Sequence, residues 1–404
     1  MKQIAKNPLY KNSFFIMLTS FTSAGFGFIF WMLAAKFYPK EDVGISTALI
    51  SSMMLIVILS RLGFNFSVIR FFPEMDRSRV FSSSVIVTTT FAIFLSIIFI
   101  LIAECISPKL NILKSAEVSL IYIIFVGIAS VVSITGVTFV AIRRAEFQFL
   151  QSLIVGSRVA LLIPLINLGV LGIFCSIGVS MAVAMIVSFS ILYFLGIKLK
   201  FAIDRDFIER SFKFSLGNYS AGMFITAPNQ IIPLIVLNVL GAEETAHYYI
   251  AFSIASLICM IPNATSMSLF VEGSYGEALK RNTIRALTFA FLLLIPSVIF
   301  IHLYGGRILA MIGRDYLSGL DLLKVMVLSS FFVTFCSMYL SIKRVQKDIS
   351  GLLYLSALIF VLLISLSYVL LIAFRLVGVG YAWVLSYGIG TIFVIISARR
   401  EGWI

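Results

Sequence analysis

The sequence predicts an all-α membrane protein with about twelve transmembrane helices in two six-helix lobes around a central cavity. Of its 404 residues, 60% are hydrophobic and only 12% are charged, against the roughly 25% that is usual in soluble domains. Apolar runs of roughly 18–25 residues recur along the chain, and a helix of this length crosses a bilayer. The connections between the runs are short, which leaves no room for a separate soluble domain.

Each apolar run predicts one helix. In order, the predicted spans are residues 13–35, 43–60, 81–103, 118–141, 150–172, 177–197, 214–239, 248–271, 286–304, 322–341, 350–373 and 378–398. Most of the 31 Lys and Arg residues lie in the connections on the side of the N-terminus. Because positively charged loops stay in the cytoplasm, this asymmetry predicts a multi-pass protein of the cytoplasmic (inner) membrane with both termini cytoplasmic.

Two pairs of short stretches indicate an internal repeat. In one register, AIRRAEFQ at 141–148 is similar to SIKRVQKD at 341–348, and IGVSMAVA at 177–184 is similar to VGVGYAWV at 377–384. The repeat predicts an N-terminal lobe over residues 1–203 and a C-terminal lobe over residues 204–404. Six helices in each lobe keep both lobes in the same orientation, so the expected symmetry axis runs along the membrane normal.

Arg158 lies inside the apolar run 150–172, about 15 Å of helix beyond Arg143 and Arg144. An arginine at the bilayer centre costs about 2.5–3.5 kcal/mol on insertion scales. That cost is tolerable if the side chain faces a wet cavity or an anionic partner. The alternative is a helix that starts later, from which Arg158 reaches the cytoplasmic interface.

Three further cations lie near the expected cytoplasmic ends of helices. Arg61 and Arg70 flank the stretch LGFNFSVI, and Lys213 opens the seventh span. These residues either line a cytoplasmic vestibule or only orient the helices through their positive charge.

The seventh span, FSLGNYSAGMFITAPNQIIPLIVLNVL at 214–240, is unusual in its proline and amide content. Pro228 and Pro233 remove backbone donors and predict a kink. The amides of Asn218, Asn229 and Gln230 need partners or water inside a bilayer. We therefore expect a moving gate that lines a cavity; hydrogen bonding between helices is the alternative.

Several classes of function lack the residues that they need. All 18 acidic residues fall in predicted loops or at helix ends, whereas cation-coupled antiporters commonly carry a carboxylate within the membrane. No metal-ligand cluster, catalytic triad or phosphate-binding Gly loop is present, and the four cysteines are scattered. The basic residues form no stripe or tail that would bind nucleic acid. The sequence predicts neither an enzyme nor a bound metal or cofactor.

Four stretches resemble one family, the polysaccharide-biosynthesis, or O-antigen-type, lipid-linked oligosaccharide flippases of the MOP superfamily. They are GFGFIFWMLAAKFYPKEDVGISTAL at 25–49, RLGFNFSVIRFFPE at 61–74, IPNATSMSLFVEGS at 261–274 and ILAMIGRDYLSGLDLLKVM at 308–326. Their order and spacing, together with the two lobes of six helices, extend the likeness over nearly the whole chain. The resemblance implies a MATE-like fold.

The resemblance also implies a function, the export of a polyprenyl-diphosphate-linked oligosaccharide for surface polysaccharide synthesis. The glycan-bearing lipid and the bilayer would then be partners, together with enzymes of glycan assembly. Arg158, with some of Arg61, Arg70 and Lys213, would bind the diphosphate, because arginine pairs with phosphate in a bidentate manner. The amides of the seventh span would contact sugar hydroxyls.

Three other classes of protein are alternatives. A MATE-type cation or multidrug antiporter shares the arrangement in two lobes, although a midplane Asp or Glu is expected there. A major-facilitator transporter has two glycines around an Asp-Arg pair after its second helix, and PEMDRSRV at 73–80 lacks both. A membrane glycan polymerase or ligase would need a larger outer loop with paired polar groups.

Overall fold

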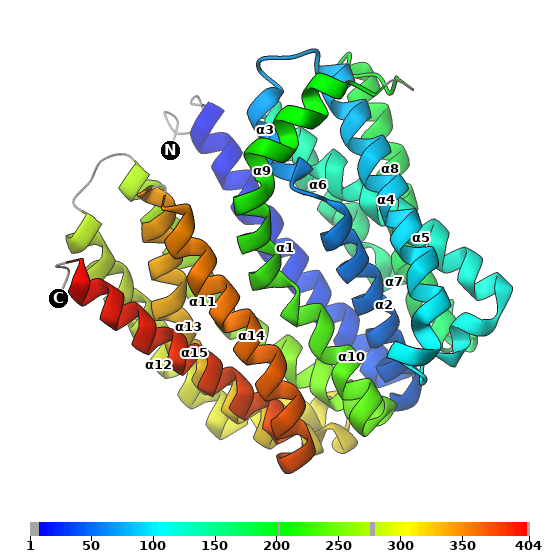
Figure 1. Cartoon of the computed structure of the whole chain (residues 1–404). Coiled ribbons are helices and arrows are strands. Elements are labelled where there is room, and N and C mark those ends of the chain that lie inside the picture. The colour runs from blue at the N-terminus through cyan, green and yellow to red at the C-terminus, as the bar shows by residue number, and fades with distance from the viewer. Residues whose placement is uncertain (1–7, 201–202, 275–278, 347, 402–404) are drawn as a thin grey trace. The chain divides into compact units, whose positions relative to one another are not determined.

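The computed structural model of the protein describes residues 8–200, 203–274, 279–346 and 348–401, and describes only the backbone at 8–11, 13, 105–106, 213–218 and 271–274. Every regular element within these ranges is a helix (Figure 1). Eleven of the described helices are long and apolar enough to cross a membrane. The chain is therefore an all-helical, multi-pass membrane protein.

By its internal contacts the chain divides into two compact units, Met1–Tyr219 and Ser220–Ile404. The division lies within one helix, α9 (Arg205–Thr226). The lobe boundary after residue 203 that the sequence suggests stays a prediction, and so does the cavity between the lobes.

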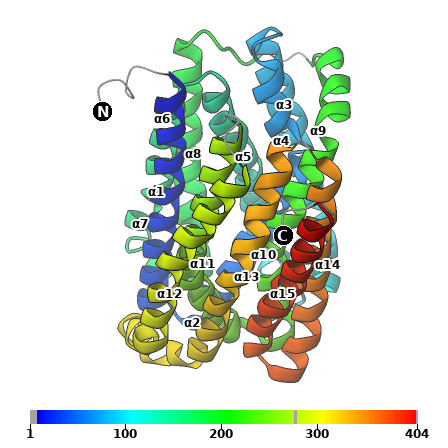
Figure 2. The same ribbon diagram turned by 90° about the vertical axis from the view of Figure 1, so that its left-hand side faces the viewer.

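The first unit is built from long helices joined by short turns. The elements that precede α9 are, in chain order, α1 (Pro8–Phe37), α2 (Lys40–Ser60), α3 (Phe64–Phe71), α4 (Arg77–Ile106), η2 (Asn111–Lys114), α5 (Ala116–Ala141), α6 (Ala145–Gly156), α7 (Arg158–Leu161), η3 (Ile166–Leu168) and α8 (Val170–Phe194). Phe64, Phe81 and Phe139 are fully buried where α3, α4 and α5 pack together. Within this unit α1 packs along α6 (Figure 2).

The second unit contains the end of α9 and six long helices. They are α10 (Pro228–Leu240), α11 (Ala242–Ser274), α12 (Leu279–Ile312), α13 (Leu320–Val345), α14 (Ile349–Phe374) and α15 (Val377–Arg400), with the short η4 (Arg314–Gly319) before α13. The last helix, α15, packs against both α13 and α14 (Figure 1). Leu355 is fully buried in the core where α14 packs against α13.

The prediction of a continuous helix over 150–172 is wrong. The chain is helical to Gly156, resumes as the short α7 and then η3, and enters α8 at Val170, well before the predicted start at 177. Pro164 follows Leu162 and Ile163 after the end of α7 and has no N–H to continue the helix. Gly169, with a φ of 54°, then turns the chain into α8. The sequence does not show this break, because residues 150–172 are apolar nearly throughout and hydrophobic periodicity alone does not locate the end of a helix.

The seventh predicted span is also interrupted. The helix α9 ends at Thr226, and α10 begins at Pro228 with Ala227 between them. Proline is well tolerated at the first position of a helix, because its missing N–H would have no intrahelical partner there. The second proline, Pro233, lies inside α10.

The two units share one backbone pattern, but in a different register from the one that the sequence suggests. In the turn between α5 and α6 the N–H of Arg144 donates to the carbonyl of Phe139, and between α13 and α14 the N–H of Asp348 donates to the carbonyl of Lys343. Arg144 is therefore equivalent to Asp348 and not to Arg344.

The second pair of similar stretches is also displaced from the suggested register. Gly169 and Arg375 have similar, unusual conformations, with φ of 54° and 52° and ψ of −126° and −143°. Three residues later, a Cβ on Gly172 or Gly378 would lie 2.1 or 2.0 Å from a carbonyl oxygen of the preceding segment. Gly172 is therefore the counterpart of Gly378, and the suggested pairing with Gly178 is wrong.

Candidate functional site

Arg158 begins α7 directly after the helix break, and its guanidinium lies against α1. The guanidinium carbon is 4.8 Å from the centroid of the Phe30 ring. One terminal nitrogen is 3.7 Å from the position that a Cβ on Gly27 would take. Phe30 is fully buried, so the ring holds the cation in partly desolvated surroundings, where such a contact is worth about 2 kcal/mol.

The contacts of Arg158 define its depth in the fold. The candidate span of α1 is Phe14–Phe37, so Gly27 lies close to the midpoint of that span. Gly156, just before the break, packs so closely on Phe26 that an added Cβ would lie 2.5 Å from the ring. Arg158 is therefore at mid-span, and its side chain does not extend to the N-terminal end of α1.

Arg61 follows the last residue of α2 and is half-buried. Its Nε is buried and has no hydrogen-bond partner among the described residues. The hydroxyl of Tyr219 donates to the carbonyls of Ile58 and Leu59, at 3.2 and 2.8 Å, at this end of α2. Burial lowers the pKa of the Arg61 guanidinium, which nevertheless stays charged at neutral pH. A cation at this position is favoured by the carbonyl dipoles of α2.

The other predicted cations are placed differently. Arg70 is exposed on α3 and pairs with Glu74 at 2.5 Å, a surface ion pair worth about 0–1 kcal/mol. Lys213 and the amide of Asn218 lie outside the residues whose side chains are described. The structure thus places Arg61, Arg70 and Arg158 on separate elements and does not gather them into one cluster.

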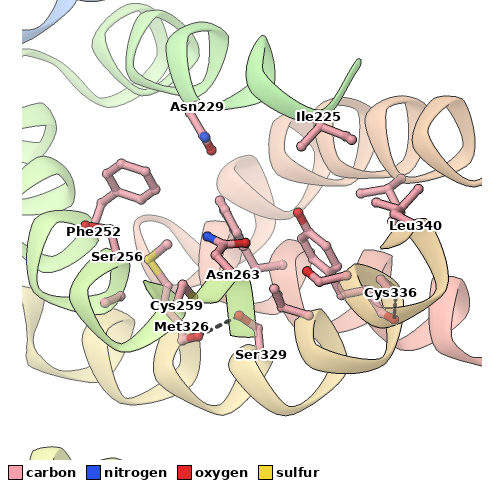
Figure 3. A pocket seen from close by; sticks show the side chains of 16 residues that line it. Ile225, Asn229, Phe252, Ser256, Cys259, Asn263, Met326, Ser329, Cys336 and Leu340 are labelled. Carbon is pink, nitrogen blue, oxygen red and sulfur yellow. Dashed lines mark hydrogen bonds between the residues drawn. The ribbon is translucent and has the colours of Figure 1, made fainter. Parts of the chain in front are cut away.

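A cavity of about 180 Å³ lies inside the second unit (Figure 3). Asn229 of α10 points into it from one side, and Asn263 of α11 lies near its middle. Ile359 of α14 and the rings of Trp383 and Tyr387 of α15 also line it. The helix break at Ala227 explains why Asn229, at the start of α10, faces this space. Gln230, its neighbour, is half-buried and does not line the cavity.

The cavity lies at the centre of the unit along the helices. Several lining residues are near the midpoints of their candidate spans: Asn229 in Tyr219–Leu240, Ser256 in Ala242–Phe270, Ser329 in Arg314–Val345, Ile359 in Ile349–Phe374 and Tyr387 in Val377–Arg400. Unpaired polar groups at this depth are costly in a membrane protein unless a ligand or water satisfies them.

Uncharged polar, aromatic and aliphatic side chains line this cavity. None of the described lining residues is charged. The hydroxyls of Ser256 and Ser329 donate to carbonyls of their own helices. The amides of Asn229 and Asn263 have no hydrogen-bond partner among the described residues, and both face the cavity.

Sequence reasoning identified Asn229 but missed Asn263, Trp383 and Tyr387. The signal for Asn263 was present, since an amide inside a predicted span needs a partner, and the same argument had selected Asn229. The aromatic pair gave no such signal, because aromatic residues are common throughout the apolar runs.

The family model described as "Polysaccharide biosynthesis protein" matches residues 9–271, which is more than half of the chain. The chain belongs to the polysaccharide biosynthesis protein family. Among curated relatives of this family member, a putative O-antigen transporter of Shigella flexneri is 26% identical over 197 residues. The match covers 45% of this chain and 45% of that protein, so it spans about half the length of the relative.

Two solved structures show the fold of this polysaccharide biosynthesis protein. The lipid II flippase MurJ, in an inward closed conformation, has a TM-score of 0.79 at 15% identity and covers 95% of this chain and 87% of MurJ. An inward-facing MATE family multidrug transporter of the MOP superfamily has a TM-score of 0.75 at 14% identity and covers 94% of both chains. The MATE-like fold that the sequence predicts is confirmed.

Proposed function

We propose that the protein is a flippase that exports a polyprenyl-diphosphate-linked oligosaccharide across the cytoplasmic membrane. The observation that carries this proposal is Arg158, a permanent cation at mid-span on the break between α6 and α7. The family, the O-antigen transporter relative and the likeness to a lipid II flippase support the same substrate class.

Arginine suits a diphosphate for physical reasons. Its planar guanidinium donates two parallel hydrogen bonds to a phosphate and stays charged at every relevant pH. Phe30 covers one face of the guanidinium and so orients the plane in which its N–H groups donate. Arg61, with its buried and unpartnered Nε, supplies a second cation at the end of α2.

The energy for export does not require a carboxylate within the membrane. A membrane potential that is negative inside favours outward movement of an anion by about 2.3 kcal/mol per charge at 100 mV. No acidic residue whose side chain is described lies near the midpoint of a candidate span. This distribution favours anion export over cation-coupled transport.

The proposal includes a location and partners. The protein is a multi-pass protein of the inner membrane with both termini cytoplasmic, and it works beside the enzymes that assemble and polymerise the glycan. It performs no covalent chemistry, because the flippase only moves its substrate between leaflets.

Reconstituted flipping tests the proposal. Purified protein in proteoliposomes would receive a fluorescent polyprenyl-diphosphate glycan, and protection of the label from an external reagent would be followed at a set membrane potential. We expect wild-type protein to flip this lipid. Arg158→Ala should slow flipping about 10- to 100-fold through loss of charge-assisted hydrogen bonds, and Arg158→Lys should retain part of the rate.

The matched control is Arg285→Ala, which removes an exposed arginine of α12. It should flip at the wild-type rate, and circular dichroism and melting should show that each variant is folded. Absence of flipping by the wild type at several potentials would refute the proposed function. Normal flipping by Arg158→Ala would refute the role of Arg158.

The second candidate function is a MATE-type cation or multidrug antiporter, which the fold also fits. Cells that express the protein would be compared with control cells for efflux of ethidium and for resistance to cationic dyes. Efflux that depends on an inward cation gradient, in the absence of glycan-lipid flipping, would favour the antiporter.

A further inference from the structure

The unit-2 cavity, which is lined by Asn229, Asn263, Ser256, Tyr387 and Trp383 among others, has unfilled hydrogen-bonding capacity. An asparagine side chain offers two donors and one acceptor oxygen. The two amides have no protein partner among the described residues. Asn263 is exposed to the cavity, and Asn229 is half-exposed. The indole N–H of Trp383 is buried and likewise has no hydrogen-bond partner. Polar groups at membrane depth need partners, so these groups await a polar ligand or water.

Aromatic rings form another part of the cavity lining. The rings of Trp383 and Tyr387 stack with centroids 5.5 Å apart and an interplanar angle of 23°. Phe252 packs on Trp383 at 6.0 Å. These rings place apolar faces beside the amides, a combination that matches the alternating C–H faces and hydroxyl edges of a sugar ring.

Charge excludes other ligand classes. The described lining contains no carboxylate to bind a cation and no Lys, Arg or His to bind a phosphate or a uronic acid. A volume of about 180 Å³ is several times the roughly 10–15 Å³ that one water molecule needs, so the cavity has room for a small ligand such as one sugar ring. An acyl chain would leave the amides of Asn229 and Asn263 unsatisfied, so a polar ligand suits this cavity better than a lipid tail.

We infer that the unit-2 cavity is a binding subsite for one uncharged sugar ring of the transported glycan. This inference rests on the proposed function and deepens it, because it assigns the glycan to the second unit and leaves the diphosphate to Arg158. Asn229 and Asn263 bind the hydroxyls, and the α15 rings contact the face of the sugar. The helix break at Ala227 lets Asn229 move with the start of α10 when the sugar leaves.

A native cysteine allows direct measurement of occupancy. Cys259 of α11 lines the cavity and is half-exposed. In purified full-length protein with the other three cysteines replaced by alanine, the rate at which a small methanethiosulfonate modifies Cys259 would be measured. The probes are glucose, galactose, rhamnose and N-acetylglucosamine as neutral sugars, glucuronate as a charged sugar, and NaCl against choline chloride.

We expect at least one neutral sugar to slow modification about fivefold or more at saturation, and glucuronate to have little effect. Asn263→Ala should raise the sugar concentration that gives half-maximal protection about tenfold, which corresponds to the loss of one to two neutral hydrogen bonds. Protection by none of the neutral sugars would overturn the inference. Protection by glucuronate to the same degree, or by sodium alone, would overturn it in favour of an anion or a cation site.

Flipping separates failure of this inference from failure of the proposed function. Asn263→Ala should slow the flipping of a glycan-bearing polyprenyl diphosphate and leave the flipping rate of the sugar-free polyprenyl diphosphate unchanged. Ser365→Ala, on the exposed side of α14 where the hydroxyl bonds only carbonyls of its own helix, is the control and should change neither rate. Equal slowing of both lipids by Asn263→Ala would overturn the sugar subsite while the flippase stands. A wild type that flips neither lipid would refute the proposed function and leaves the Cys259 protection as an independent result.

Discussion

The guanidinium of Arg158 lies 4.8 Å from the ring centroid of Phe30, and Phe30 is fully buried. The aromatic face therefore stabilises a cation that would otherwise be costly at mid-span. The same contact orients the plane of the guanidinium, so Phe30 would be a positioning residue in the proposed diphosphate site.

Phe30→Leu keeps an apolar side chain and removes the aromatic face. We expect the free energy of unfolding to fall by about 1–2 kcal/mol, the range of a partly desolvated cation–π contact. Flipping of the diphosphate lipid should fall less than in Arg158→Ala, because the charge remains. Thermal melting in detergent and the proteoliposome assay measure the two effects. A variant with unchanged stability and unchanged flipping would show that the ring contact has no role.

The close approach of α15 to the end of α14 can be tested at Gly378. An added Cβ would lie 2.0 Å from the carbonyl oxygen of Leu370, and backbone cannot move aside as a flexible side chain can. Gly378→Ala should therefore destabilise the protein by at least about 3 kcal/mol, at the upper end of overpacking effects, and reduce the yield of folded protein.

The control lies on the same helix. Gly388 has nothing within 4 Å of its Cβ position, so Gly388→Ala should be neutral or stabilise by up to about 1 kcal/mol through helix propensity. The comparison is made by yield of monodisperse protein and by melting temperature. Equal melting temperatures for the two variants would contradict the close approach.

Composition predicted the membrane class and nearly all of the helices, because a span must be long and apolar whatever it packs against. The break at Gly156–Arg158 was not predicted, since it depends on the packing of Gly156 against Phe26 and on Pro164 further along. The register of the repeat was also wrong, because similar residues recur at equivalent membrane depths. Turn geometry, such as the conformation shared by Gly169 and Arg375, defines the register.

The candidate site was only partly accessible to sequence reasoning. Arg158 and Asn229 stand out in the sequence because a charge and an amide are rare in apolar runs. The distinct surroundings of the two residues, an aromatic face in the first unit and an uncharged cavity in the second, depend on tertiary contacts. No pattern in the sequence separates Trp383 and Tyr387 from the other aromatic residues.

Arg375 tests backbone strain at a position where the first unit has glycine. Its φ of 52° and ψ of −143° belong to a region that is nearly restricted to glycine and costs about 1–3 kcal/mol for other residues. Its ion pair with Glu244 is long, at 3.9 Å, and the arginine is largely exposed, so the pair contributes about 0–1 kcal/mol. Arg375→Gly should therefore stabilise the protein by about 1 kcal/mol, after the entropy of glycine in the unfolded chain is subtracted.

The comparison variant is Arg375→Ala, which loses the ion pair and keeps the strained conformation. It should be no more stable than the wild type. The reciprocal change, Gly169→Ala, should destabilise, since its Cβ would also approach the Asp42 carboxylate at 3.0 Å. Melting temperatures of the three variants decide the matter, and a lower melting temperature for Arg375→Gly than for Arg375→Ala would contradict the strain.

Asp348 links stability to pH at the start of α14. Its carboxylate accepts a hydrogen bond from the N–H of Gly351 at 3.0 Å and pairs with the buried ammonium of Lys343 at 3.0 Å. The backbone hydrogen bond, followed by the interaction with Lys343, lowers the pKa of Asp348 from its ordinary value. The pKa in the unfolded chain, about 3.9, is therefore higher than in the folded protein. The stabilisation is complete above that value and is lost as the pH falls through the folded pKa.

The melting temperature of purified wild-type protein should therefore drop steeply below about pH 4, measured in a detergent whose headgroup does not titrate. Asp348→Asn cannot ionise, so its melting temperature should be lower than that of the wild type at neutral pH and should fall less on acidification. Asp321→Asn, which removes an exposed acid from the first turn of α13, should keep the wild-type acid slope. If Asp348→Asn loses as much stability between neutral and acid pH as the wild type, the cap and its ion pair with Lys343 do not contribute to the acid sensitivity of the fold.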